Sequence, residues 1–160
     1  MKIKIMTTGG TIDKIYFDQK SQFQVGKPQI SEILTEANVT VDFEVETLLR
    51  KDSLDLTDED RQLIYRAVAA DDHHHLLITH GTDTMLLTAQ LLQQIPGKVM
   101  VLTGSMQPAR LRFSDAIFNI GYAIAAVQLL PPGVYVAMNG RIFEPGKARK
   151  NIEMNRFEAL

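Results

Sequence analysis

The 160-residue sequence contains no cysteine. This absence excludes disulfide bonds, metal sites built on thiolates and cysteine nucleophiles. No apolar run approaches the roughly 20 residues that cross a bilayer, and the N-terminal "MKIKIM" lacks the apolar segment of a signal peptide. From the sequence alone we therefore predict a protein that makes no membrane contact and resides in the cytoplasm.

An excess of charge is also missing. The net charge is −2 and the basic residues are scattered along the chain, so the sequence predicts no surface for nucleic acid. The phosphate-binding patterns G-x-G-x-x-G and G-K-[ST] do not occur. The adjacent histidines at 73–75 would point to alternate sides of an extended segment, which disfavours a metal site. We expect no metal or organic cofactor, and a small anionic or zwitterionic ligand remains possible.

The residues that are present indicate one ordinary globular domain, with 45% hydrophobic and 22% charged residues. Apolar alternation and buried apolar runs predict strands over 2–7, 41–48, 75–81, 98–104 and 134–138. Helical spacing predicts helices over 57–70, 83–95 and 114–130, with Thr57 and Ser114 as N-caps. Strands that alternate with helices predict an α/β fold, a single domain whose mainly parallel sheet is covered by helices on both faces.

Glycines follow three of the predicted strands, at Gly9-Gly10, Gly81 and Gly104. Ligands of open α/β sheets bind beyond the carboxyl ends of the strands, so we expect these turns to line one active site. Segment 13–28 has no clear period and directly follows the first glycine turn. It is therefore a candidate lid over the pocket.

Two of the glycine turns carry hydroxyl groups. "TGGT" at 8–11 is explained by a structural turn as well as by a site, but "THGTDT" at 79–84 repeats the glycine–threonine pair at a second strand end. Capping accounts for Asp83 at a helix start, whereas Thr82 has no such reason to be there. Thr11 and Thr82 are thus predicted to face one small molecule. A threonine nucleophile needs a base and oxyanion donors, and lysine and tyrosine are the candidate bases.

These motifs resemble the bacterial-type L-asparaginase family. "TGGTI", "DSLDLT", "THGTDTM", and "LTGSMQPA" with "SDAIFN" occur in the order typical of that family and span nearly the whole chain. The resemblance implies a parallel α/β fold that needs no cofactor. It also implies hydrolysis of L-asparagine to L-aspartate and ammonia, with weak or no glutaminase activity, in a homo-oligomer such as a dimer or tetramer.

The resemblance assigns catalytic roles to specific residues. It implies that Thr11 is the nucleophile that forms an acyl-enzyme, and that Thr82, Asp83 and Lys150 form a second catalytic group. Lys150 matches by order and spacing rather than by a motif. Lys147 is the alternative match. The non-functional alternative is that Lys150 is an ordinary solvated surface lysine.

Substrate-binding roles follow from the same resemblance. Ser53 and Asp83 are expected to hold the α-carboxylate and the α-ammonium group of the amino acid. Asp83 suits the ammonium group, and Ser53 with the backbone amides at Gly10, Gly81 and Thr82 suits the carboxylate.

The sequence departs from the family pattern in the predicted lid. The stretch "SQFQVG" has Phe23 where the family has a catalytic tyrosine, and a phenyl ring cannot transfer a proton. Tyr16 lies in the same segment, and we predict that it replaces the missing tyrosine. The alternative is that Tyr16 is a half-buried loop aromatic, like Phe17 and Phe23.

A second departure concerns length. Family members usually continue into a smaller C-terminal domain that completes the active site of a neighbouring subunit, whereas this sequence stops at "NRFEAL". We expect residues 1–160 to be an asparaginase N-terminal-type catalytic domain in a short form that lacks the usual C-terminal domain. A fragment of a longer protein is the alternative.

Other functions stay open at this point. The chain could be an ammonia-generating partner of an amidotransferase, or an amidase for a related small amide. It could also be a non-catalytic amino-acid sensor that kept the pocket without the tyrosine, or a flavodoxin-like nucleotide-binding module. The retention of Thr11, Thr82, Asp83 and a lysine favours catalysis.

Overall fold

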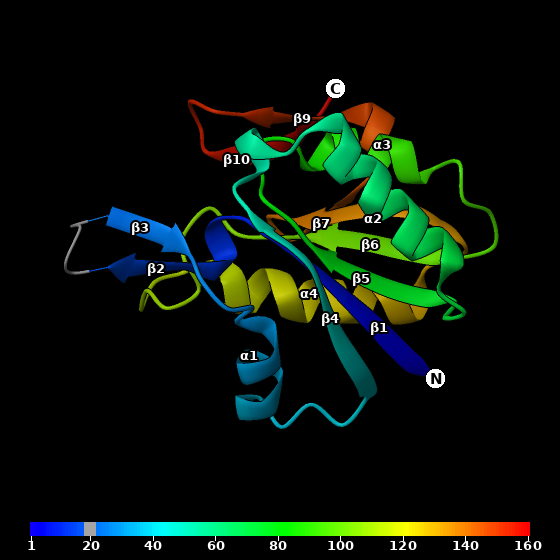
Figure 1. Cartoon of the computed structure of the whole chain (residues 1–160), viewed down its shortest axis with the longest axis horizontal. Helices are drawn as coiled ribbons and strands as arrows, with labels where there is room; N and C mark the ends of the chain where they lie inside the picture. The colour runs from blue at the N-terminus through cyan, green and yellow to red at the C-terminus, as the bar shows by residue number, and fades with distance from the viewer. Residues whose placement is uncertain (18–21) are drawn as a thin grey trace.

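The computed structural model of the chain describes residues 1–17 and 22–160. At its centre lies a six-stranded sheet in the order β4-β1-β5-β6-β7-β8 (Figure 1). Its strands are β1 (Lys2–Gly9), β4 (Asp42–Lys51), β5 (His75–Thr79), β6 (Val99–Thr103), β7 (Gly133–Met138) and β8 (Arg141–Phe143). Neighbouring strands run parallel except for β7 and β8, which pair antiparallel. The predicted mainly parallel α/β sheet is confirmed.

Helices cover both faces of this sheet. They are α1 (Ile30–Glu36), α2 (Asp58–Ala70), α3 (Met85–Leu92) and α4 (Ala116–Leu129). Helices α2 and α3 lie on one face, and α4 lies on the other (Figure 1). Strand β1 serves both layers, because Met6 packs with the α2–α3 cluster whereas Ile3 and Ile5 pack with the α4 cluster. This double burial explains why the central strands read as nearly continuous apolar runs.

Helix starts agree with the prediction in one case and differ in two. Thr57 caps α2 through a capping box, in which its hydroxyl accepts the N–H of Asp60 at 3.2 Å and the Asp60 carboxylate accepts the N–H of Thr57 at 2.9 Å. Helix α4 begins one residue late, because its N-cap is Asp115 and not Ser114. The Ser114 hydroxyl still accepts the N–H of Ala116.

Helix α3 begins at Met85 rather than at 83, and its N-cap is Thr84, whose side chain makes no capping bond. Asp83 therefore lies in the turn before the helix. Helix capping, which would explain an aspartate at this position without any function, therefore does not account for Asp83.

Several elements were not predicted from the periodicity. They are a hairpin of β2 (Lys14–Phe17) and β3 (Gln22–Val25), helix α1, a terminal hairpin of β9 (Ala148–Asn151) and β10 (Arg156–Ala159), the edge strand β8, and the 3-10 turns η1 (Thr11–Asp13), η3 (Ser53–Asp55) and η4 (Pro145–Lys147). The β2–β3 hairpin occupies the predicted lid and projects from the body of the protein (Figure 1). Residues 18–21 of that lid lie outside the described residues.

In the part of the chain that the structure describes, every helix is too short or too polar to cross a bilayer.

The capping box of α2 gives a direct test of the fold. Replacing Thr57 by Ala removes the hydroxyl that accepts the Asp60 N–H, and we expect it to lower the free energy of unfolding by about 1 kcal/mol. Urea denaturation measures this change. Thr40→Ala, at an exposed loop position, serves as the control and should change stability much less. Equal effects of the two substitutions would contradict the assigned role of the cap.

Candidate active site

Two strand ends meet at the centre of the candidate site. Strands β1 and β5 are hydrogen-bonded neighbours, with Thr7 opposite Thr79, so the turns that follow them lie side by side. Gly10 has a φ of 90°, and a Cβ on it would come 2.5 Å from the Cα of Gly81. Only glycine permits this contact. Thr11 and Thr82, each of which follows its glycine directly, therefore extend from backbones that touch.

Lys150 joins Thr82 and Asp83. Its ammonium group donates to Thr82 Oγ1 at 2.7 Å and to Asp83 Oδ1 at 2.7 Å, and its side chain is 16% exposed. Lys150 lies on β9, opposite the buried Phe157 of β10. Lys147, the alternative, instead forms an ion pair with Glu144 at 2.7 Å. The structure thus brings together three of the predicted catalytic side chains.

Ser53 packs against the same glycine turn. It follows β4 in η3 and is 1% exposed, and its hydroxyl has no hydrogen-bond partner among the described residues. A Cβ on Gly81 would lie 2.5 Å from the Ser53 Cβ. The Ser53 carbonyl also accepts the Thr84 hydroxyl at 2.8 Å. The predicted substrate-binding residues Gly10, Gly81 and Ser53 therefore form one continuous contact.

Thr11 and Tyr16 are less constrained. Thr11 is half-buried in η1, and no hydrogen bond holds its hydroxyl within residues 1–17 and 22–160. Tyr16 pairs with Phe23 across the hairpin, with ring centroids 5.6 Å apart in an edge arrangement. Both rings are about half exposed. Tyr16 therefore carries its phenol next to the position that Phe23 occupies, and neither ring is buried in the core.

An ion pair that the sequence did not reveal joins the hairpin to the site. Lys14, the first residue of β2, binds Asp52 at 2.7 Å, and Asp52 also accepts the N–H of Leu54. Burial acts to raise the pKa of Asp52, but these hydrogen bonds and the charges of Lys14 and Lys150 outweigh it and hold the pKa below its usual value. The available signal in the sequence was the opposite charge of Lys14 and Asp52, which follow the paired strands β1 and β4.

His80 supports the glycine turn at Gly81 from the protein interior and was not identified from the sequence. It is fully buried, with Nδ1 2.7 Å from the Gly81 carbonyl and Nε2 2.8 Å from the Thr88 hydroxyl. Because a carbonyl only accepts, Nδ1 carries the hydrogen and Nε2 accepts from Thr88. Burial lowers the pKa of His80 to about 4, so the ring is neutral at pH 7. Its position directly before Gly81 was the available signal.

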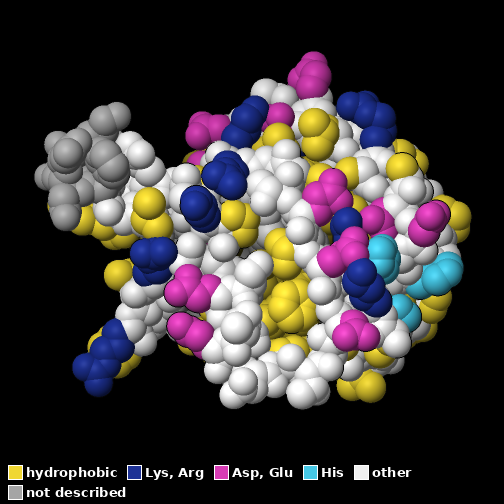
Figure 2. All heavy atoms as spheres, turned by 60° about the horizontal axis from the view of Figure 1, so that its bottom comes forward, with side chains coloured by type: hydrophobic (Ala, Val, Ile, Leu, Met, Phe, Trp, Pro, Cys, Tyr) yellow, Lys and Arg dark blue, Asp and Glu magenta, His cyan; other side chains and the backbone are white. Residues whose placement is uncertain are grey.

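Within the described residues, no group of three or more histidine, aspartate or glutamate side chains is arranged to hold a metal ion. On the face drawn in Figure 2, acidic and basic side chains are interspersed, and the visible histidines lie on the side opposite to the hairpin.

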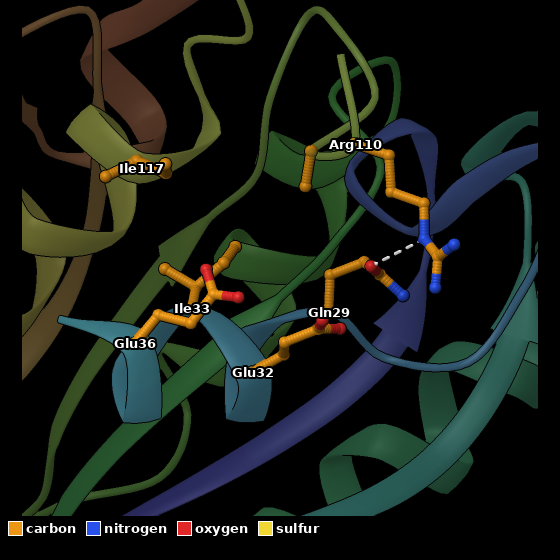
Figure 3. A pocket seen from close by; sticks show the side chains of 7 residues that line it. Gln29, Glu32, Ile33, Glu36, Arg110 and Ile117 are labelled. Carbon is orange, nitrogen blue, oxygen red and sulfur yellow. Dashed lines mark hydrogen bonds between the residues drawn. The ribbon is translucent and has the colours of Figure 1, made fainter. Parts of the chain in front are cut away.

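Two hollows lie near the elements described above. One, of about 380 Å³, opens beside Lys150 and is lined by residues 149–153. The other, of about 350 Å³, lies between α1 and segment 109–117, where Arg110 donates to the Gln29 side chain at 3.0 Å (Figure 3). The second hollow contains none of the predicted site residues.

Fold and site together define a parallel α/β domain with a hydroxyl, lysine and carboxylate cluster at the carboxyl ends of its strands. The family model described as asparaginase, N-terminal, matches residues 2–160. The chain belongs to the asparaginase family.

Individual relatives agree with this assignment. The chain is 31% identical over 170 residues to the L-asparaginase of Thermococcus kodakarensis, covering 100% of this chain and 51% of the relative. It is 29% identical over 180 residues to the glutaminase-asparaginase of Pseudomonas aeruginosa, covering 98% and 48%. The chain therefore spans about half the length of these relatives.

Solved structures show the same fold. The thermostable L-asparaginase from Thermococcus kodakarensis superposes with a TM-score of 0.85 at 30% identity, covering 100% of this chain and 51% of that one. The probable cytoplasmic L-asparaginase from Campylobacter jejuni gives 0.83 at 28% identity, covering 99% and 52%. The resemblance read from the motifs is confirmed.

The tight contact beneath the site can be tested with one added methyl group. Gly81→Ala would press its Cβ against Ser53, and we expect a loss of roughly 1–3 kcal/mol in the free energy of unfolding. Gly146→Ala is the matched control, because a Cβ there meets no atom within 4 Å. Chemical denaturation compares the two variants. If Gly81→Ala were as stable as Gly146→Ala, the contact would be looser than described.

Proposed function

We propose that this chain hydrolyses the side-chain amide of L-asparagine to L-aspartate and ammonia. The observation that carries the proposal is the contact between Gly10 and Gly81, because it brings Thr11 next to the cluster of Thr82, Asp83 and Lys150. Membership of the asparaginase family supports it.

In the proposed reaction, the Thr11 oxygen attacks the amide carbon and forms a tetrahedral intermediate. Backbone N–H groups of the glycine turns stabilise its oxyanion. The carbon–nitrogen bond then breaks, the nitrogen takes up the threonine proton and leaves as ammonia, and an ester remains on Thr11. Water hydrolyses this ester, which releases L-aspartate and restores the hydroxyl.

Proton transfer in this scheme uses the neighbouring cluster. Thr82 directly follows Gly81, which touches the first glycine turn, and its bond to Lys150 gives it a partner that can give up and regain a proton. Asp83 balances the lysine charge. Tyr16, on the hairpin that begins just after Thr11, is the proposed residue that activates the nucleophile.

Substrate binding is assigned to groups around Gly81. The buried Ser53 hydroxyl, which has no partner among the described residues, and the amides at Gly10, Gly81 and Thr82 are proposed to bind the α-carboxylate. Asp83 is proposed to bind the α-ammonium group. Glutamine is longer by one methylene, which is worth only about 1–3 kcal/mol of discrimination. We propose weak or no glutaminase activity.

The setting of the reaction is also a proposal. We place residues 1–160 as the catalytic domain of a cytoplasmic homo-oligomer, a dimer or tetramer, that binds neither nucleic acid nor membranes. Ile117 and Phe118 at the start of α4 are each 61% exposed, and such apolar surface supports association of subunits. Sedimentation of the purified chain tests the oligomeric state.

Ammonia release from L-asparagine and from L-glutamine is the primary test. We expect release from asparagine, and we expect Thr11→Ala and Lys150→Met each to lower kcat/KM by roughly 10³-fold or more, because they remove the nucleophile and the proton partner. Lys147→Met is the matched control, since Lys147 is exposed and bound to Glu144, and it should retain activity.

Undiminished activity of Thr11→Ala would refute the proposal. A wild-type chain that binds aspartate but releases no ammonia would instead be an amino-acid sensor. Release that requires a second protein would identify an amidotransferase partner.

Tyr16 is tested separately from the central cluster. Tyr16→Phe should lower kcat by about 10²- to 10⁴-fold, which is the usual contribution of a positioned acid or base. Phe23→Leu is the control and should retain most of the activity. Because the two rings are neighbours, adding Phe23→Tyr to Tyr16→Phe should restore part of the lost rate. Full activity of Tyr16→Phe would exclude this role.

A further inference from the structure

A buried carboxylate lies two residues beyond the proposed nucleophile. Asp13 closes the η1 turn, in which its own N–H donates to the Gly10 carbonyl at 3.1 Å. Its residue is only 2% exposed, and one carboxylate oxygen, Oδ2, is buried without a hydrogen-bond partner among the described residues. Burying a carboxylate costs free energy unless hydrogen bonds offset the loss of water. The bonds that Asp13 makes therefore indicate why it is buried.

Asp13 ties together the two ends of the β2–β3 hairpin. Its backbone carbonyl accepts the N–H of Gly26, just past β3, at 2.8 Å. Its carboxylate Oδ1 accepts the N–H of Gln29, the N-cap residue of α1, at 2.9 Å. Strand β2 begins directly after Asp13, at the end of η1, and the chain comes back to bond with Asp13 just after β3. Asp13 is therefore the base of the hairpin.

The hairpin is a separate element outside the central sheet. It projects from the body (Figure 1), and its first residue, Lys14, adds the bond to Asp52. Among the described residues, β2 and β3 form a separate two-stranded sheet and pair with no strand of the central sheet. A small rotation at the base would therefore displace Tyr16 over a larger distance. Displacements near 1 Å at a reacting group are enough to lower rates by about 10²-fold.

We propose that Asp13 is a positioning residue, whose bonds to Gly26 and Gln29 set the direction of the β2–β3 hairpin and thereby place Tyr16 over Thr11. It touches neither the substrate nor the reacting atoms. The inference rests on the proposed function only for the catalytic use of Tyr16.

The charge of Asp13 controls the strength of this hold. Burial raises the pKa of Asp13 to about 6, against the opposing effects of the Gln29 N–H and the charge of Arg50. Charged side chains on the neighbouring elements include those of Arg50, Arg110, Glu32, Lys14 and Asp52, and Lys27 lies between Gly26 and Gln29. Above pH 6 the carboxylate is ionised and its bond to Gln29 is charge-assisted, and as pH falls through 6 it becomes a weaker neutral bond.

Fluorine NMR of protein that carries 3-fluorotyrosine tests the inference without relying on activity. The chain has four tyrosines, and the Tyr16 signal is the one that disappears in Tyr16→Phe. We expect it to shift between pH 5 and 7.5 with a midpoint near 6. In Asp13→Asn, which keeps an acceptor but cannot ionise, the signal should stay at its low-pH position throughout. Glu36→Gln, at an exposed position of α1, should titrate like wild type.

Kinetics provide a second readout. At pH 8 we expect kcat to fall roughly three- to tenfold in Asp13→Asn, the value of a lost charge assistance, and about 10²-fold in Asp13→Ala, with KM changed little. Adding Asp13→Ala to Tyr16→Phe should lower kcat hardly further, because Tyr16 no longer needs to be placed.

Three outcomes would overturn the inference. A Tyr16 signal that does not titrate in wild type would show that Asp13 does not move the hairpin. A titration that persists in Asp13→Asn would assign it to a histidine. A full loss of kcat on adding Asp13→Ala to Tyr16→Phe would show a purely structural role. Titration of Tyr16 without any ammonia release would leave the positioning role in place and refute the proposed function.

Discussion

The site depends on backbone contact between two glycine turns. Gly10 and Gly81 approach so closely that a Cβ on Gly10 would lie 2.5 Å from the Cα and N of Gly81. A side chain on Gly10 would separate β1 from the turn after β5, and with it Thr11 from Thr82, whereas a side chain on Gly81 would press against Ser53. The buried His80 donates a hydrogen bond to the Gly81 carbonyl, which helps to hold the Gly81 backbone in place. The relative position of Thr11 and Thr82 is thus set by backbone contact rather than by long side chains.

Lys150 reaches this contact from far along the chain, which makes its placement a tertiary property. Its strand, β9, is held by β10 and by the packing of Phe157 with Phe143. The two bonds of its ammonium group, to Thr82 and Asp83, link the end of the chain to the centre of the sheet. An ammonium group in a partly buried place is stabilised by such partners, so folding of the terminal hairpin and assembly of the site are coupled.

Much of this arrangement could be predicted from the sequence. The carboxyl ends of parallel strands lie at one edge of a sheet, and two of the predicted strands are followed by a Gly-Thr pair. The buried strands and the Thr57 cap follow from local patterns. The hairpins and η1 do not, since β2 and β3 are short and their cross-strand pairs, such as Tyr16 with Phe23, give no period. Asp13 and His80 were missed for another reason. Burial, which gives each its role, is set by elements remote in sequence.

Two kinds of constraint therefore meet at Thr11. On its N-terminal side the glycine contact leaves the backbone almost no freedom, whereas on its C-terminal side the hairpin is held mainly at its base, by Asp13 and by the ion pair of Lys14 with Asp52. As the proposed nucleophile, Thr11 needs a fixed position relative to the proposed oxyanion donors, the backbone amides of the glycine turns. The hairpin group proposed to activate it must also let substrate enter and product leave. A hairpin hinged on a few polar bonds meets that second need, because such bonds break and re-form at lower cost than the packing of a core.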